Sequence, residues 1–335
     1  MFLRDCGVVD PGYMIDLSRR LVKVVRKALA VQKPAVLRAG KLSVNGVSYN
    51  RRRLDGPLDT ELQVLRIDGT DGSTLAVLLN YACHPVTSGP DNRLTSADFP
   101  GVVLRLFEAQ TGSVALFTNG ACGDINPVGD LVPKGDYPNH FALAQTLGST
   151  LFEAAFSVWE KLVPLDSAPI QLHRRNLHLP LQACPDEKEL CSLATQYAIN
   201  IVTAAREMND VHYRLEAAML DWVMATVEAM RLGELKTEVQ AEVQTLRIGD
   251  VSLVGVPAEL FARLGQDIKQ QAHTPFTFVS TYTNGNVGYI PTREEYPYCG
   301  YEVAEAYRYY GYPAAVAPEA GEMIVEAAVE LANGP

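Results

Sequence analysis

The stretch of sequence that decides the fold is Glu61–Tyr81, ELQVLRIDGTDGSTLAVLLNY. Residues 61–68 alternate apolar and polar side chains, which is typical of a half-buried strand. Gly-Thr-Asp-Gly at 69–72 supplies a turn, and the apolar run at 74–81 predicts a strand in the centre of a sheet. The two segments therefore predict a β-hairpin.

A second hairpin is predicted at Val239–Val256, where VQAEVQTLRI and VSLVGV flank a Gly-Asp turn. Both hairpins carry Leu-Arg-Ile just before the turn. Unrelated hairpins often share such a pattern, because the turn and the paired strands impose the same local requirements on the sequence. An internal repeat and a chance likeness are therefore both open.

Helices and strands alternate along the rest of the chain. The patterns predict helices over 15–31, 99–110, 141–161, 187–232 with a break near Asn209, and 319–333, and further strands over 35–49, 113–118, 169–180 and 276–281. This order predicts a mixed α/β fold, with flanking helices and chemistry at the loops that follow strands. No linker stands out, so we expect a single α/β unit over residues 1–335.

The composition is that of a globular protein with a small-molecule partner. Of the 335 residues, 47% are hydrophobic and 20% are charged, which is enough apolar material for a core. The net charge of −10 disfavours nucleic-acid binding, which depends on Lys and Arg. No run reaches the roughly 18–20 apolar residues of a transmembrane helix, and six cysteines show no disulfide pattern. A cytoplasmic location is the default expectation, and the oligomeric state stays open.

Three loops that follow predicted strands concentrate reactive side chains. His84 lies in Cys83-His84-Pro85, directly after the strand at 74–81, where it is either a functional or a capping histidine. Asn119–Pro127, NGACGDINP, is a glycine-rich loop. Its Gly120 and Gly123 allow backbone amides to approach a ligand or form an oxyanion site, and Asp124 can equally bond its own backbone. Glu259 follows the second hairpin and precedes a segment with nine tyrosines between 282 and 312.

Four motifs together resemble the neutral/alkaline non-lysosomal ceramidase family. They are NYACHPVTSGPDNRLTSADFPG at 80–101, ALFTNGACGDINP at 115–127, LRIGDVSLVGVPAELFARLG at 246–265, and NGNVGYIPTREEY with GYE at 284–302. Their order and spacing match across nearly the whole chain. The resemblance implies a zinc-dependent hydrolase of an N-acyl amide bond, in which zinc-bound hydroxide attacks the amide carbonyl of a small-molecule substrate. It also implies an α/β catalytic domain, and we expect this chain to lack the C-terminal immunoglobulin-like domain of larger members.

Carried onto this sequence, the resemblance assigns the metal ligands and the groups around them. His84, Glu259 and Tyr289 correspond to zinc ligands, and Tyr301 to a tyrosine that contacts the substrate carbonyl. Arg51 corresponds to an active-site arginine, with Arg52 as the alternative register. Asp98 is expected to orient the metal-bound histidine from behind.

Two departures from the family keep other functions open. The family's upstream His-Thr-His-Ser-Gly segment, with a further zinc histidine, has no counterpart, because no histidine precedes His84. The chain is thus expected to be incomplete at its N-terminus, which leaves secretion possible, and either to bind zinc weakly or to recruit a ligand such as Cys83. Cys122 replaces a serine of the ceramidases proper. The alternatives are a non-catalytic member that binds a ligand or partner, and a metal-independent thiol hydrolase that uses Cys122 and His84.

Overall fold

The computed structural model describes residues 9–89, 92, 94–131, 140–166 and 168–334. Residues 90, 91 and 93, within the first of the four motifs, lie outside the described chain. Backbone contacts divide the chain into two compact units. The larger comprises 35–179, 239–302 and 317–335, and the smaller comprises 1–34, 180–238 and 303–316. One unit was expected because no linker stands out in the sequence. Three of the five crossings between the units, at 34/35, 179/180 and 238/239, lie at the ends of long strands rather than in a linker.

The first hairpin forms the centre of a five-stranded sheet in the larger unit. The sheet order is β5-β4-β3-β1-β7, with β1 Ala35–Ser43, β3 Glu61–Gly69, β4 Thr74–Tyr81, β5 Val114–Asn119 and β7 Val163–Pro164. The strands β3 and β4 pair antiparallel, as the sequence predicts, and β4 pairs parallel with β5. A parallel pair needs a crossover, which the helix α2, Asp98–Thr111, provides.

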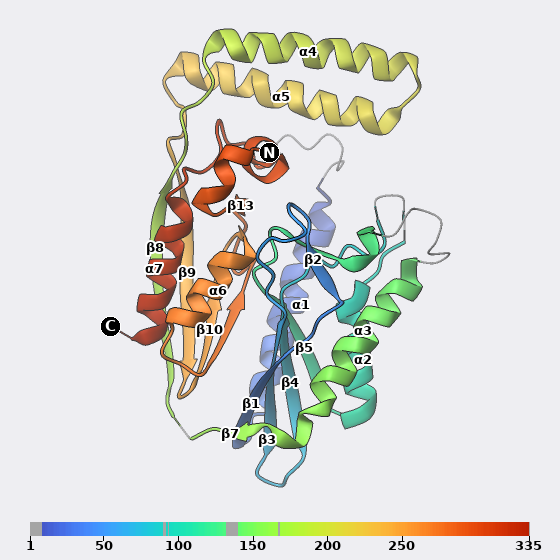
Figure 1. Ribbon diagram of the computed structural model, residues 1–335, viewed down its shortest axis with the longest axis vertical. Helices are drawn as coiled ribbons and strands as arrows, with labels where there is room; N and C mark the ends of the chain where they lie inside the picture. Colours follow the sequence, from blue (N-terminus) through green and yellow to red (C-terminus); the bar gives the residue numbers. More distant parts are fainter. Residues whose placement is uncertain (1–8, 90–91, 93, 132–139, 167, 335) are drawn as a thin grey trace. The chain divides into compact units, whose positions relative to one another are not determined.

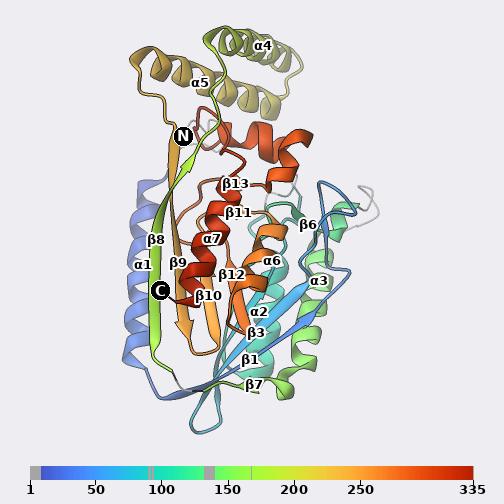
Figure 2. The ribbon, with the colours of Figure 1, turned by 60° about the vertical axis from the view of Figure 1, so that its left-hand side comes forward.

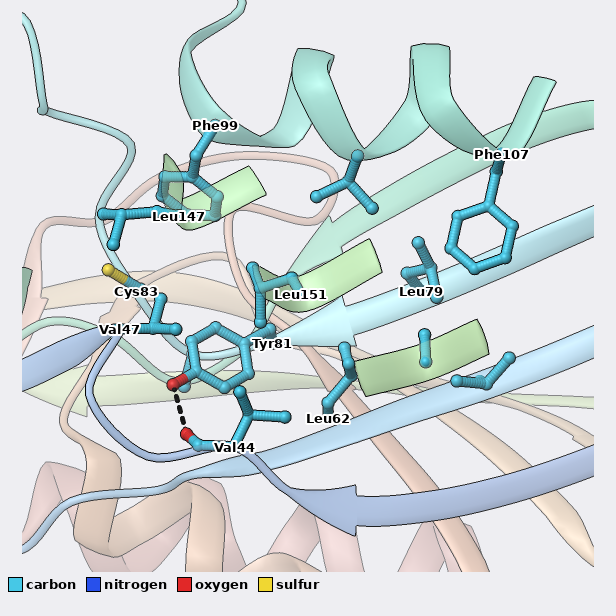
Figure 3. Packing of buried hydrophobic residues seen from close by; sticks show 14 of the residues in the cluster. Val44, Val47, Leu62, Leu79, Tyr81, Cys83, Phe99, Phe107, Leu147 and Leu151 are labelled. Carbon is cyan, nitrogen blue, oxygen red and sulfur yellow. Dashed lines mark hydrogen bonds between the residues drawn. The ribbon is translucent and has the colours of Figure 1, made fainter. Parts of the chain in front are cut away.

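One face of this sheet is covered by α2 and by α3, His140–Ser157 (Figure 1). Phe99 and Phe107 of α2 meet Leu147 and Leu151 of α3 above Leu79 of the sheet, as Figure 3 shows. All five side chains are fully or almost fully buried. The sequence predicted one helix up to residue 161, whereas α3 ends at Ser157 and a short 3-10 turn, Trp159–Lys161, follows. Trp159 then packs back onto Phe107.

The second hairpin builds a four-stranded sheet of the same kind (Figure 2). Its order is β12-β10-β9-β8, with β8 Ile170–Pro180, β9 Glu238–Ile248, β10 Val251–Gly255 and β12 Phe276–Ser280. The strands β9 and β10 pair antiparallel, and β10 pairs parallel with β12 across the helix α6, Ala262–Gln271. The helix α7, Ala320–Asn333, packs beside α6. The two sheets face one another through an apolar layer that includes Leu65, Val251 and Phe278.

Two pairs of short strands close the larger unit near the ends of the central strands. The strand β2, Ser48–Asn50, pairs antiparallel with β6, Ile125–Pro127. The strand β11, Glu259–Leu260, pairs parallel with β13, Tyr289–Ile290. Each pair fixes one of the loops in which the sequence concentrates reactive side chains.

The smaller unit is helical and contains α1 Pro11–Ala30, α4 Glu187–Arg206 and α5 Asp210–Leu232. Asn209 caps α5 by accepting a hydrogen bond from the His212 amide, which explains the predicted break there. The helices α4 and α5 pack along one another around Trp222. None of the described helices combines the length and apolar character needed to cross a bilayer. The architecture confirms the predicted mixed α/β fold.

Candidate functional site

The candidate site forms where four strands of the larger unit end. His84 follows β4, and Cys122 follows β5. Glu259 follows β10, and Tyr282 follows β12. The amide of Thr281 donates to the Asn119 carbonyl at 3.0 Å, which joins the ends of β5 and β12 directly. Residues up to 198 positions apart therefore meet in one buried polar cluster.

His84 is the centre of this cluster. Its Nε2 lies 3.6 Å from Oε2 of Glu259, and its Nδ1 lies 3.2 Å from Sγ of Cys122. Burial, assisted by the positive charge of Arg51, lowers the pKa of His84 to about 3. The imidazole is therefore neutral at pH 7, which is the form that ligates a metal or accepts a proton.

Tyr282 is the member of the cluster that sequence reasoning missed. Its hydroxyl lies 3.4 Å from Nδ1 of His84 and 3.7 Å from Sγ of Cys122, and it donates to Oε2 of Glu259 at 3.3 Å. Burial and the nearby Cys122 and Glu259 raise its pKa, so the phenol keeps its proton. The residue pattern marked the tyrosine-rich segment only as a whole, and the family resemblance singled out Tyr289 and Tyr301 but not Tyr282.

Cys122 is fully buried, and its thiol is protonated at neutral pH. Burial raises its pKa to about 12, with a smaller contribution from the negative charge of Glu259. A thiolate nucleophile needs the opposite environment, one that is partly exposed and electropositive. The short distance to His84 is therefore a contact between a neutral thiol and a neutral imidazole.

Arg51 connects the cluster to the tyrosine-rich segment. Its guanidinium donates to the Tyr289 hydroxyl at 3.2 Å, to the Gly123 carbonyl at 3.0 Å and to Glu302 at 2.9 Å. Tyr289 also hydrogen-bonds Glu259, and burial is the main cause of its raised pKa. The ring of Tyr301 packs edge-on against that of Tyr289 at 5.8 Å between centroids.

Arg52, the alternative register, makes different contacts. Its guanidinium donates to Glu295 at 2.8 Å, to Glu302 at 2.6 Å and to the Cys299 carbonyl at 2.7 Å. Arg51, and not Arg52, therefore contacts the tyrosine expected to bind metal.

The glycine-rich loop is fixed by packing. A Cβ at Gly123 would lie 2.5 Å from the Glu259 carbonyl oxygen, and one at Gly120 would lie 3.0 Å from Ala82. Their amides donate to the carbonyls of Leu260 and Tyr81, each at 2.9 Å. Both donors are thus engaged within the fold, and an oxyanion site here would need other N–H or O–H groups.

Asp124 in the same loop ties two distant elements together. Its carboxylate accepts from the Ala262 amide at 2.8 Å and from Nδ2 of Asn50 at 2.7 Å. Phe261, at the N-cap of α6, makes no side-chain capping bond, so Asp124 caps this helix from another part of the chain. Burial raises its pKa to about 6 despite these hydrogen bonds.

Cys83 and Asp98 lie behind the cluster. The side chain of Cys83 packs in the apolar core beside Phe99 and Leu147 (Figure 3), so it is not placed to become a metal ligand with His84. Asp98 accepts from the amide and hydroxyl of Thr87 at 3.0 and 2.7 Å. Asp98 therefore holds the loop that carries His84, and its expected role in orienting the ring stays a prediction.

His84, Glu259 and Tyr289 would offer a metal ion one nitrogen and two oxygens. Nε2 of His84 and Oε2 of Glu259 face one another, and the Tyr289 hydroxyl contacts Glu259. Nδ1 of His84, on the side of the ring away from Nε2, lies near Sγ of Cys122 and the hydroxyl of Tyr282. The second nitrogen of a metal-binding histidine likewise usually has a hydrogen-bond partner. In the described chain, no group of three or more His, Cys, Asp or Glu side chains has a metal-binding arrangement, and a third protein donor beside His84 and Glu259 would be the phenol of Tyr289.

The fold and this cluster define a mixed α/β protein with a polar site at the ends of paired strands. No protein-family model matches the sequence. The fold is similar to that of the neutral ceramidase from Pseudomonas aeruginosa, with a TM-score of 0.64 and 19% identity over 93% of this chain. It is also similar to a ceramidase complexed with C2, with a TM-score of 0.64 and 17% identity over 92% of this chain. The chain spans about half of those proteins, 54% of each. The similarity establishes a shared, ceramidase-like fold, as the sequence motifs predicted.

Proposed function

We propose that this protein is a zinc-dependent hydrolase of an N-acyl amide bond in a small molecule. The observation that carries the proposal is the meeting of His84, Glu259 and Tyr289 with Arg51, which come from four separate segments of the larger unit. The ceramidase-like fold supports it. The reaction consumes one water and yields a carboxylate and an amine.

His84, Glu259 and Tyr289 would hold the metal. A bound zinc ion supplies Lewis-acid polarisation of a carbonyl and activation of water near neutral pH. The neutral state of His84 suits ligation, because a protonated imidazole has no free lone pair.

Arg51 and Tyr301 would bind the carbonyl oxygen of the amide. Glu302 holds the guanidinium of Arg51 in place through a hydrogen bond of 2.9 Å, so this donor is oriented before substrate arrives. Tyr301 is 44% exposed and packs on Tyr289, which places its hydroxyl-bearing ring between solvent and the buried cluster.

The direct test is metal analysis of the purified protein together with hydrolysis of N-acyl amides. We expect zinc near one equivalent and amide hydrolysis that a chelator abolishes, and both should be lost in His84→Ala. A protein that binds zinc but hydrolyses no N-acyl amide would indicate the non-catalytic alternative, a family-like fold that binds a ligand.

A thiol hydrolase is the second candidate, because Sγ of Cys122 lies 3.2 Å from Nδ1 of His84. The burial of Cys122 and its raised pKa count against it. Activity that survives chelation and disappears in Cys122→Ala would establish the thiol mechanism in place of the zinc mechanism.

A further inference from the structure

A cavity lies next to the candidate site and shares Arg51 with it. It has a volume of about 540 Å³ and is lined by Arg51–Arg53, Glu295 and Tyr298–Glu302, all in the larger unit. Tyr298 and Tyr301 are 65% and 44% exposed and form its aromatic walls. A cavity with so many charged groups differs from the apolar pocket that a long hydrocarbon chain would need.

The charged groups of this cavity alternate in one continuous chain. Glu302 pairs with Arg51 and Arg52, at 2.9 and 2.6 Å. Glu295 pairs with Arg52 and Arg53, at 2.8 and 3.2 Å. Three guanidinium groups thus share two carboxylates, and one positive charge is in excess.

Arg53 has the most exposed of the three guanidinium side chains. The side chains of Glu295 and Glu302 are only 8% and 6% exposed, whereas that of Arg53 is 43% exposed. Arg53 stacks over Tyr298 at 5.6 Å from the ring centroid, which holds its planar group at the cavity wall. A planar guanidinium presents several N–H donors at once and therefore suits carboxylate and phosphate oxygens.

The backbone at Cys299 and Gly300 holds the guanidinium of Arg52 in its ion pairs with Glu295 and Glu302. Cys299 adopts a positive φ of 53°, which is uncommon outside glycine, and its carbonyl accepts a hydrogen bond from Arg52. Gly300 has φ of +89°, and a Cβ there would lie 2.9 Å from Nη1 of Arg52. The backbone thus has a positive φ at two successive residues, Cys299 and Gly300, beside the guanidinium of Arg52. Arg53 is the more exposed of the two neighbouring arginines.

We propose that this cavity binds an anionic group of the substrate, a carboxylate or a phosphate, through Arg53. The inference rests on the proposed function for the reaction itself, and it adds the class of substrate: an N-acyl compound that carries a negative charge near the amide, rather than a neutral lipid amide. Because Arg51 borders both the cavity and the metal-ligand cluster, the anion and the amide would lie on either side of one side chain.

Three substrates with the same acyl chain test the proposal. They are N-hexanoylglycine, which carries a carboxylate, N-hexanoyl-phosphoethanolamine, which carries a phosphate, and N-hexanoylethanolamine, which is neutral. We expect kcat/KM for at least one charged compound to exceed that for the neutral one by about tenfold or more, mainly through KM, as one charge-assisted contact allows. Which of the two charged compounds is preferred distinguishes carboxylate from phosphate. Equal values for all three compounds would overturn the proposal.

Variants of Arg53 give the second arm of the experiment. In Arg53→Ala the preference for the charged compound should collapse, in Arg53→Glu it should reverse, and in Arg53→Lys it should be partly retained. Arg293→Ala is the matched control, because Arg293 is also half-exposed and paired with a glutamate, Glu322, but does not line the cavity. A preference that is unchanged in Arg53→Ala, or lost equally in Arg293→Ala, would contradict the assignment.

Direct binding separates this inference from the proposed reaction. Calorimetric titration of the whole protein with N-hexanoylglycine and N-hexanoyl-phosphoethanolamine should show binding by one of them that weakens about tenfold or more in Arg53→Ala. Such binding without any hydrolysis would retain the anion site and reject the amidase. Hydrolysis without charge preference would retain the amidase and reject the anion site.

Discussion

Two regions of the larger unit have the same plan, and their differences determine what the site contains. The first module, residues 61–119, is the hairpin β3-β4, the crossover helix α2 and the parallel strand β5. The second module, residues 239–280, is the hairpin β9-β10, the crossover helix α6 and the parallel strand β12. The shared Leu-Arg-Ile pattern thus belongs to a shared arrangement of strands and helix.

The modules contribute different chemistry from equivalent places. After the second hairpin strand, the first module supplies the imidazole of His84, and the second supplies the carboxylate of Glu259. After the parallel strand, the first supplies the thiol of Cys122, and the second supplies the phenol of Tyr282. A repeated backbone therefore brings four strand ends to one point, while the loop residues decide which donors meet there.

The largest expected effect comes from removing one donor of each module in turn. His84→Ala and Glu259→Gln should each lower amide hydrolysis on the order of a thousandfold, because each removes an expected metal ligand. Metal content and kcat/KM of the purified variants measure this. His178→Ala, on the strand β8, is the control, and a variant that loses one donor yet keeps full metal and activity would show that the two modules do not form one site.

A pH effect is expected from Asp124, which belongs to the first module but caps the helix of the second. Its pKa is raised from the ordinary 3.8 to about 6 by burial. The folded protein therefore holds a proton that the unfolded chain has already lost, so stability falls as the pH rises from about 4 to about 6. The shift of about two pKa units corresponds to about 3 kcal/mol.

Asp124→Asn removes this titration. Urea unfolding at pH 4 and pH 7 should show a smaller fall in the free energy of unfolding in the variant than in the parent protein. Asp55→Asn, an exposed position, serves as the control. If the free energy of unfolding falls between pH 4 and pH 7 by the same amount in Asp124→Asn as in the parent protein, the pKa of Asp124 is not raised by its burial in the folded state.

Gly123, in the loop after the first module, packs directly against the backbone of Glu259 in the second. A substitution at Gly123 tests how much stability this close contact requires. A Cβ there would meet the Glu259 carbonyl at 2.5 Å, and backbone cannot yield as a flexible side chain can. Gly123→Ala should lower the free energy of unfolding by about 2 kcal/mol. Gly120→Ala, where the nearest contact is 3.0 Å, should cost less, and equal costs in urea unfolding would argue against this reason for glycine in the loop.

The sequence predicts the elements of both modules well, because alternation, turn residues and capping are local signals. The hairpins at 61–81 and 239–256 are present with the expected turns, and Asn209 divides the long helical stretch. The end of α3 was placed too late, because the turn at Trp159 is set by packing on Phe107 rather than by a local stop signal.

The site was only partly predictable. Motif resemblance pointed to His84 and Glu259, which the structure brings together, but the capping of α6 by Asp124 joins residues 138 positions apart. No local pattern encodes such a contact. The same reason hid Tyr282, whose role depends on a positive φ of 58° and on partners from three other segments.

The smallest expected effect is a change in zinc affinity on substitution of Tyr282. Tyr282 occupies the place in the second module that Cys122 occupies in the first, after the parallel strand. Tyr282→Phe keeps the ring and removes the hydroxyl that lies near Nδ1 of His84 and donates to Glu259. Groups that orient a metal ligand from behind typically change metal affinity by about tenfold when removed. We therefore expect zinc affinity to fall about tenfold, with kcat/KM recovered when zinc is added in excess.

The thiol provides the comparison for that variant. Cys122→Ala removes the other group near Nδ1 of His84, and Tyr213→Phe, in α5, is the control for a tyrosine outside the site. If the two modules orient His84 jointly, zinc affinity should fall further in the double variant than in either single one. Because the phenol also donates a hydrogen bond to Glu259, Tyr282→Phe should have the larger single effect, and the reverse order would assign the orientation of His84 to the first module alone.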